Sequence, residues 1–168
     1  EDKVKRRLSH AELYAEVARF QQLLIANGID EGDRVAGYLP NLPETLIAML
    51  ATAALGAIWS SASPDFGVQG VLDRFGQSEP KLLVCVDGYW YNGKHVDCLA
   101  KNAEVVSKLP SLVRTVVVPY LNAHPDIGNI AGAVCWSDLV AVDEQAEVIF
   151  RRVPFDHPLY IMFSSGTT

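Results

Sequence analysis

The sequence has few cysteines, no excess of positive charge and no long apolar run, and each absence argues against a class of function. Its three cysteines show no CxxC spacing, which argues against a zinc knuckle or a thioredoxin-type site and fits a reducing compartment. Fourteen Lys and Arg against twenty Asp and Glu give a net charge of -6, so a broad nucleic-acid-binding surface is not expected. The longest apolar stretch, Leu46 to Trp59, is shorter than the roughly 20 residues that cross a bilayer, so we predict no membrane span.

What the sequence does contain is a regular alternation of helical and strand patterns. Hydrophobic periodicity and turn residues predict helices over 9–27, 44–55, 68–77, 96–109 and 137–142, and strands over 34–39, 57–61, 81–86, 114–118 and 159–163. With 49% hydrophobic residues, this alternation predicts an α/β fold, a mostly parallel sheet with helices on both faces. Residues 119–136 lose the periodicity and are predicted to be an irregular surface excursion.

Short polar signals mark where the helices begin. Ser9 and Glu12 have the spacing of a capping box, and Pro43 suits the first turn of the second helix. Asp65 lies just before the third predicted helix, and we expect it to cap that helix rather than to act as a catalytic acid.

Ligands of parallel sheets bind beyond the carboxyl ends of the strands, which directs attention to the turn after Val86. Gly88 to Lys94 matches G-x-x-x-x-G-K, the start of a nucleotide-binding P-loop, but His95 stands where that motif needs Ser or Thr to hold magnesium. Three interpretations stay open: a P-loop, a surface loop that turns at Asn92-Gly93, and a partner-facing loop in which the lysine meets a phosphate and an aromatic ring stacks.

A run of hydroxyl side chains follows the last predicted strand. Hydroxyls and free backbone N–H groups can surround phosphate oxygens, and a glycine permits the tight path that such a loop needs. A plain turn of small polar residues is the alternative. The candidate phosphate-binding residues are Ser164, Ser165, Gly166, Thr167 and Thr168.

The hydroxyl run resembles the Ser/Thr/Gly-rich phosphate loop of the adenylate-forming enzymes, a family that includes acyl-CoA synthetases, peptide-synthetase adenylation domains and luciferases. The resemblance extends upstream through Gly32–Ala36, Leu39–Asn41 and the Ala-rich helix that ends at Leu55, and it covers nearly the whole chain. Three further segments, Gly56–Gly67, Val71–Phe75 and Tyr91–Lys94, resemble the branch of this family that activates acetoacetate.

The resemblance implies an acid–thiol ligase. ATP and acetoacetate would form an acyl-adenylate with release of pyrophosphate, and the thiol of coenzyme A would then displace AMP. Ser164–Thr168 would hold the β- and γ-phosphates of ATP, with Mg²⁺ offsetting their charge. Gly93 and Lys94 match the place where relatives contact coenzyme A, and Lys94 would meet a coenzyme A phosphate. The spacing of the four histidines indicates no metal site in the chain itself.

The resemblance also places the catalytic groups elsewhere in a longer chain. The sequence has no starting methionine, and we expect residues 1–168 to be a partial N-terminal adenylating domain that makes no acyl-CoA alone. We expect the protein to work in the cytoplasm on small molecules. Three alternatives stay open: a ligase for acetate or another short acid, a nucleotide-binding module that uses Gly88–Lys94, and a non-catalytic α/β interaction domain.

Overall fold

Six parallel strands form the centre of the structure, a computed structural model that describes residues 5–139 and 146–163. The strands lie in the order β7-β6-β3-β1-β2-β8, and each neighbouring pair runs parallel. Their bounds are β1 Arg34–Tyr38, β2 Ile58–Ala62, β3 Leu82–Val86, β6 Arg114–Val118, β7 Ala133–Cys135 and β8 Tyr160–Ile161. The predicted parallel sheet is confirmed.

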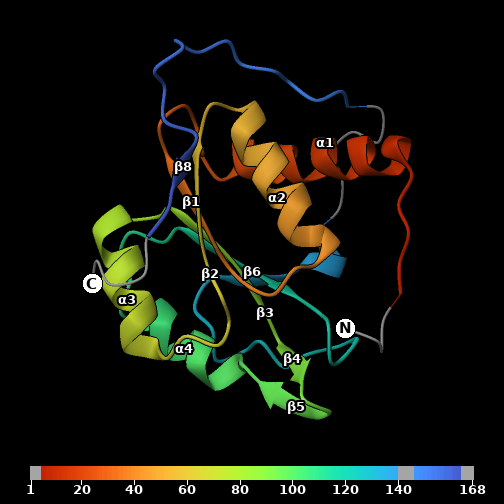
Figure 1. Ribbon diagram of the computed structural model, residues 1–168, viewed down its shortest axis with the longest axis vertical. Coiled ribbons are helices and arrows are strands. Elements are labelled where there is room, and N and C mark those ends of the chain that lie inside the picture. Colours follow the sequence, from red (N-terminus) through yellow and green to blue (C-terminus); the bar gives the residue numbers. More distant parts are fainter. Residues whose placement is uncertain (1–4, 140–145, 164–168) are drawn as a thin grey trace.

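Two helices cover each face of this sheet (Figure 1). The first pair is α1 (His10–Ala26) and α2 (Pro43–Ala54), and the second is α3 (Val68–Ser78) and α4 (Leu99–Ser107). Successive side chains of a strand point to opposite faces, so Val35 packs with the first pair and Ala36 with the second. Within the described ranges, no helix combines the length and the apolar character of a bilayer-spanning segment.

The helix starts follow the local signals at α1 and α2 but not at α3. Ser9 Oγ accepts a hydrogen bond from the Glu12 amide at 3.2 Å, and the Glu12 carboxylate accepts one from the Ser9 amide at 2.7 Å, which confirms the capping box. Pro43 is the first residue of α2. The N-cap of α3 is Gly67, so the prediction that Asp65 caps this helix is wrong, because its carboxylate is engaged by a side chain from another strand.

A β-hairpin occupies the segment where a loop and the start of the 96–109 helix were predicted. Its antiparallel strands are β4 (Gly88–Tyr91) and β5 (Lys94–Asp97). Asn92 and Gly93 have φ angles of 48° and 75°, the left-handed pair that a two-residue hairpin turn requires. A P-loop would instead lead from a strand into a helix N-terminus. The P-loop interpretation of Gly88–Lys94 is therefore wrong, and the turn at Asn92-Gly93 is confirmed.

The chain is irregular over 119–132 and then adds the edge strand β7. This strand lies within the range predicted as an excursion, and its three residues are too few to show a strand pattern in the sequence. A single 3-10 turn, η1 (Trp136–Asp138), overlaps the start of the helix predicted over 137–142, part of which lies outside the described residues.

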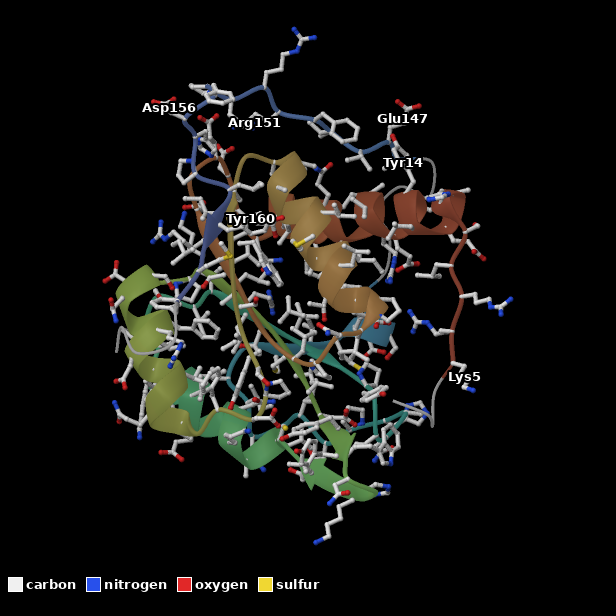
Figure 2. The ribbon with its side chains drawn as sticks, in the orientation of Figure 1. Lys5, Tyr14, Glu147, Arg151, Asp156 and Tyr160 are labelled. Atoms are coloured by element: carbon white, nitrogen blue, oxygen red, sulfur yellow. The ribbon has the colours of Figure 1, made fainter. Side chains whose placement is uncertain are left out.

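Residues 146–159, the returning segment, cross back over α1 to reach β8 (Figure 1). Gln21 Nε2 donates to the Ile149 carbonyl at 2.9 Å, and the Ile149 amide donates to Gln21 Oε1 at 2.7 Å. Tyr14 Oη accepts from the segment's backbone at 3.1 Å, and Figure 2 shows this side chain directed toward it. Arg151 forms an ion pair with the turn that precedes β1. These contacts set the path along which β8 approaches β2.

Candidate functional site at the carboxyl edge of the sheet

The sheet changes its direction of winding at β1. β2 lies on one side of β1, whereas β3, β6 and β7 follow one another on the other side. The helices that follow β1 and β3 lie on opposite faces, so the loops leaving these two strands diverge. Open α/β sheets bind ligands in the crevice at such a point, beyond the carboxyl ends of the strands.

A cavity of about 690 Å³ lies at this edge. Four stretches supply most of its lining: 39–45 after β1, 61–65 at the end of β2, 89–91 in β4, and 118–120 at the end of β6. The volume falls within the range of small-molecule sites, about 300 to 1,000 Å³. The winding of the sheet and the cavity thus indicate the same place as the candidate site.

The loop Ser63–Gly67, which follows β2, contributes a wall of the cavity and is held by two neighbouring elements. Tyr38 Oη and Lys101 Nζ both donate to the Phe66 carbonyl, at 2.5 and 3.5 Å. Lys101 Nζ, from α4, also donates to a second loop carbonyl at 2.5 Å. Burial raises the pKa of Tyr38, so its hydroxyl keeps the proton that it donates.

A third contact to this loop comes from the hairpin. Tyr89 Oη donates to Asp65 Oδ1 at 2.5 Å, and Asp65 Oδ2 accepts from Ser63 Oγ at 3.1 Å. Burial and then the hydrogen bond to the carboxylate raise the pKa of Tyr89, so the phenol stays a donor. Sequence reasoning missed this pair because the two residues are 24 positions apart and meet only through the strand order.

Asp87 organises the loop on the other side of the cavity. It follows β3 directly and is 3% exposed. Its two carboxylate oxygens accept hydrogen bonds of 2.8 to 3.1 Å from the amides of Tyr120, Leu121 and Asn122. Hydrogen bonds to a carboxylate offset much of the penalty for burying it. The sequence does contain a signal for this residue, since Asp87 directly follows an apolar predicted strand, but a search for glycine-rich motifs does not detect it.

The hairpin presents the residues expected to contact coenzyme A. Trp90 packs edge-on against Tyr120 and His95, with ring centroids 4.9 and 5.4 Å apart, which braces the hairpin against the loop after β6. Gly93 and Lys94 are exposed at its outer end. Lys94 stands opposite Tyr91, which lines the cavity. Lys94 is thus paired with a residue of the cavity wall, although neither Gly93 nor Lys94 lines the cavity itself.

An ion pair lies at the same rim. Arg6 Nη1 is 2.7 Å from Glu44 Oε1, and the Glu44 side chain is nearly buried in the first turn of α2. The partial positive charge of a helix N-terminus also favours a carboxylate at this position. The cavity wall thus holds balanced charges at α2, while Asp65 adds a negative one.

The predicted phosphate-binding residues, Ser164–Thr168, lie outside the described residues. The chain that leads to them is described: β8 pairs with β2 at Tyr160 and Ile161, and Ser60 Oγ donates to the Ile161 carbonyl at 3.1 Å. The last predicted strand is therefore confirmed, but it is two residues long. Across 5–139 and 146–163, no three His, Cys, Asp or Glu side chains gather to hold a metal ion.

The parallel sheet and the cavity where its winding changes define a doubly wound α/β protein with a small-molecule site at its carboxyl edge. Comparison with known proteins narrows this class. The family model described as AMP-binding enzyme matches residues 2–168, and the chain belongs to that family.

Relatives within this family match along the whole chain. The chain is 54% identical over 169 residues to acetoacetyl-coenzyme A synthetase of Rhizobium meliloti (strain 1021), which covers 100% of this chain and 26% of that protein. It is 40% identical over 163 residues to malonamoyl-CoA synthetase of Penicillium aethiopicum, and this match covers 94% of this chain and 22% of that protein. The solved structure of acetoacetyl-CoA synthetase from Streptomyces lividans has a TM-score of 0.87 and 46% identity over 97% of this chain and 24% of that one. The chain spans about a quarter of the length of these relatives.

Proposed function

We propose that the whole protein is an acid–thiol ligase that uses ATP to activate acetoacetate and then transfers the acyl group to coenzyme A. The carboxylate attacks the α-phosphorus of ATP, which gives an acyl-adenylate and pyrophosphate. The coenzyme A sulfur then attacks the acyl carbon, and AMP leaves with its phosphate oxygen. The observation that best supports this proposal is the 54% identity, over the entire chain, to an acetoacetyl-coenzyme A synthetase.

In this proposal Ser164–Thr168 bind the β- and γ-phosphates of ATP through hydroxyls and backbone amides. Their contribution is to hold the triphosphate in line for attack and to stabilise its charge, rather than to transfer a proton. Mg²⁺ would enter with the triphosphate and offset its charge. The described residues offer no cluster of ligands for it, so we assign it no residue and no step. No residue of this chain is proposed as catalytic.

The hairpin is proposed to bind coenzyme A. Lys94 is exposed opposite Tyr91, a residue of the cavity wall, and suits a phosphate as a point charge, while Gly93 keeps the turn narrow. Tyr89 and Trp90 anchor the hairpin on both sides, so the lysine projects from a fixed support. We also propose a cytoplasmic location, with which three unpaired cysteines agree.

The phosphate-loop proposal is tested in the full-length protein by acid-dependent exchange of pyrophosphate into ATP. Acetoacetate, acetate and malonamate are compared, and we expect acetoacetate to support the fastest exchange. Replacing Ser165 and Thr167 by Ala should slow exchange about 100-fold, the scale of losing preorganised donors. Ser107→Ala, an exposed serine on α4, is the matched control and should leave exchange unchanged.

The 168-residue chain alone should show no exchange. Undiminished exchange in the Ser165/Thr167 variant, or faster exchange with another acid, contradicts the corresponding part of the proposal.

Coenzyme A binding is tested separately because the first half-reaction does not need it. Lys94→Ala should raise the KM for coenzyme A about tenfold, as expected for losing one charge-assisted contact, while pyrophosphate exchange stays unchanged. Lys108→Ala is the matched control, since Lys108 is exposed and pairs with Glu104 on α4. An unchanged KM for coenzyme A in Lys94→Ala would remove the hairpin from the proposed site.

A further inference from the structure

One arginine on α3 contacts aromatic rings from two segments that lie far apart in the sequence. The Arg74 guanidinium lies 4.4 Å from the centroid of the Phe66 ring and 5.8 Å from that of Phe163. Its Nη1 donates to the Gly70 carbonyl at 2.6 Å, which ties the long side chain to its own helix. A guanidinium over an aromatic face is attracted most strongly when water is partly excluded, and the Arg74 hydrogen bond to Gly70 is part-buried.

The first ring belongs to a fixed part of the candidate site. Phe66 lies in the Ser63–Gly67 loop, and its carbonyl accepts hydrogen bonds from Tyr38 and Lys101. The loop is also held by the hydrogen bond between the Tyr89 hydroxyl and Asp65. Phe66 therefore offers Arg74 a surface that is already anchored to β1, β4 and α4.

The second ring stands at the entry to the proposed phosphate loop. Phe163 is joined by one peptide bond to Ser164, the first residue of the hydroxyl run. The strand that delivers it, β8, pairs with β2 through only two residues, so the ladder alone gives weak control over the path of the chain beyond it. A side-chain contact at Phe163 adds a constraint just where the ladder ends.

We propose that Arg74 is a positioning residue for ATP, which fixes the start of the phosphate loop against the Ser63–Gly67 loop. This inference rests on the proposed role of Ser164–Thr168. Arg74 is proposed to contact neither the reacting atoms nor the acid. Its role is to hold Phe163, the residue directly before the hydroxyl run. Because triphosphate binding is a matter of position, release of this contact weakens ATP binding more than coenzyme A binding.

Two substitutions separate the guanidinium from simple bulk. Arg74→Met keeps a long apolar stem but loses the charge, whereas Arg74→Lys keeps a charge but loses the planar group that covers a ring. In the full-length protein, Arg74→Met should raise both the Kd for ATP with Mg²⁺ and the KM for ATP about two- to fivefold, the range that a partly exposed cation–π contact supports. Arg74→Lys should fall between Arg74→Met and the unaltered protein. The KM for coenzyme A should change less than about twofold, because the hairpin does not touch Arg74.

The controls test whether the contact with Phe66 carries the effect. Phe66→Leu should reproduce part of the ATP defect, and the Phe66→Leu/Arg74→Met double variant should be no worse than Arg74→Met alone, because the two residues share one interaction. Lys108→Met loses a positive charge on α4 and should leave the Kd and KM for ATP unchanged. Thermal unfolding of each variant verifies that the protein is folded at the assay temperature.

The outcomes distinguish this inference from the proposed function. If the unaltered protein binds ATP but does not activate acetoacetate, the proposed substrate fails while the ATP measurements still decide the role of Arg74. If Arg74→Met is folded and binds ATP like the unaltered protein, or if ATP and coenzyme A constants rise together, Arg74 is only structural and the inference is overturned. Absence of ATP binding in the unaltered protein overturns both.

Discussion

Tyr89 Oη lies 2.5 Å from Asp65 Oδ1 and joins the hairpin to the loop after β2, across the end of β1. The ring of Tyr89 is 9% exposed, whereas Asp65 faces solvent, so the bond connects the protein interior to the cavity rim. This hydrogen bond and the ring contact between Trp90 and Tyr120 together orient the hairpin, and with it Lys94, relative to the wall of the candidate site.

Tyr89→Phe removes this hydrogen bond while keeping the ring. We expect the KM for coenzyme A to rise about two- to tenfold, the range of one net hydrogen bond, because the hairpin loses an anchor. Pyrophosphate exchange should change less, because Tyr38 and Lys101 still hold the Ser63–Gly67 loop. Steady-state kinetics of the full-length protein give both values. Lys108→Ala is the control, since Lys108 is exposed on α4, outside the hairpin and the cavity lining, and its substitution should change neither value.

Asp87→Asn should loosen the loop after β6. An amide keeps one acceptor oxygen but turns an NH₂ group toward backbone N–H donors, so some of the four hydrogen bonds are lost. We expect amide hydrogen exchange over 120–122 to speed up about tenfold or more, as measured by mass spectrometry. Asp126→Asn, an exposed residue on the same irregular stretch, should leave that exchange unchanged. Unaltered protection in Asp87→Asn would show that the carboxylate does not hold this loop.

Two glycines of the hairpin should respond differently to alanine. A Cβ on Gly88 would meet the Val96 carbonyl oxygen at 2.5 Å and the Leu121 side chain, whereas a Cβ on Gly93 meets nothing within 4 Å. Gly88→Ala should therefore lower the free energy of unfolding by about 3 kcal/mol through overpacking. Gly93→Ala should lower it by about 1 kcal/mol, because only its φ of 75° is strained. Urea unfolding measures both, and a reversed order would contradict the hairpin geometry.

Stability should fall in alkaline solution as the buried thiols ionise. Burial raises the pKa of Cys98 from its ordinary 9.0 to about 11, and burial also raises the pKa of Cys85. A raised folded-state pKa contributes stability that is complete below the unfolded pKa and is lost as the pH rises through the folded pKa. The urea midpoint should therefore decline between about pH 9 and pH 11. Cys98→Ala should show a shallower decline, and an equal slope would exclude Cys98 as a cause.

The part of the fold set by neighbouring residues could be predicted from the sequence. The capping box of Ser9 and Glu12 and the strand at 114–118 depend on residues a few positions apart. The sequence predicts a helix from residue 96 because Val96 and the apolar residues after it continue a helical spacing, and it leaves the Asn92-Gly93 turn as one of three open interpretations. Whether such a short hairpin forms depends on its packing against other segments, and the spacing of apolar residues does not predict that packing.

The walls of the candidate site were beyond sequence reasoning for a related cause. Asp87, Tyr89 and Lys101 act on segments that lie 24 to 37 positions away. Asp87 reaches the loop after β6 because β6 is the neighbour of β3, and the other two reach the loop after β2 because only β1 separates β3 from β2. Hydrophobic periodicity predicts where strands lie in the sequence but not which strands are neighbours in the sheet. The family resemblance predicts which residues bind ATP and coenzyme A. The hydrogen bonds that hold the neighbouring loops in place are evident only in the structure.

The returning segment determines how β8 joins the sheet. Figure 2 shows Arg151 within this segment and Tyr160 directly after it; Arg151 forms an ion pair with Asp30, and Tyr160 Oη donates to Met49 Sδ at 3.6 Å. A slip of β8 by one residue against β2 would turn its side chains to the opposite faces of the sheet, since side chains alternate along a strand. Tyr160 would then lose its contact with Met49 on α2. The contacts of Arg151 and Tyr160 thus determine which face of the sheet each side chain of β8 occupies.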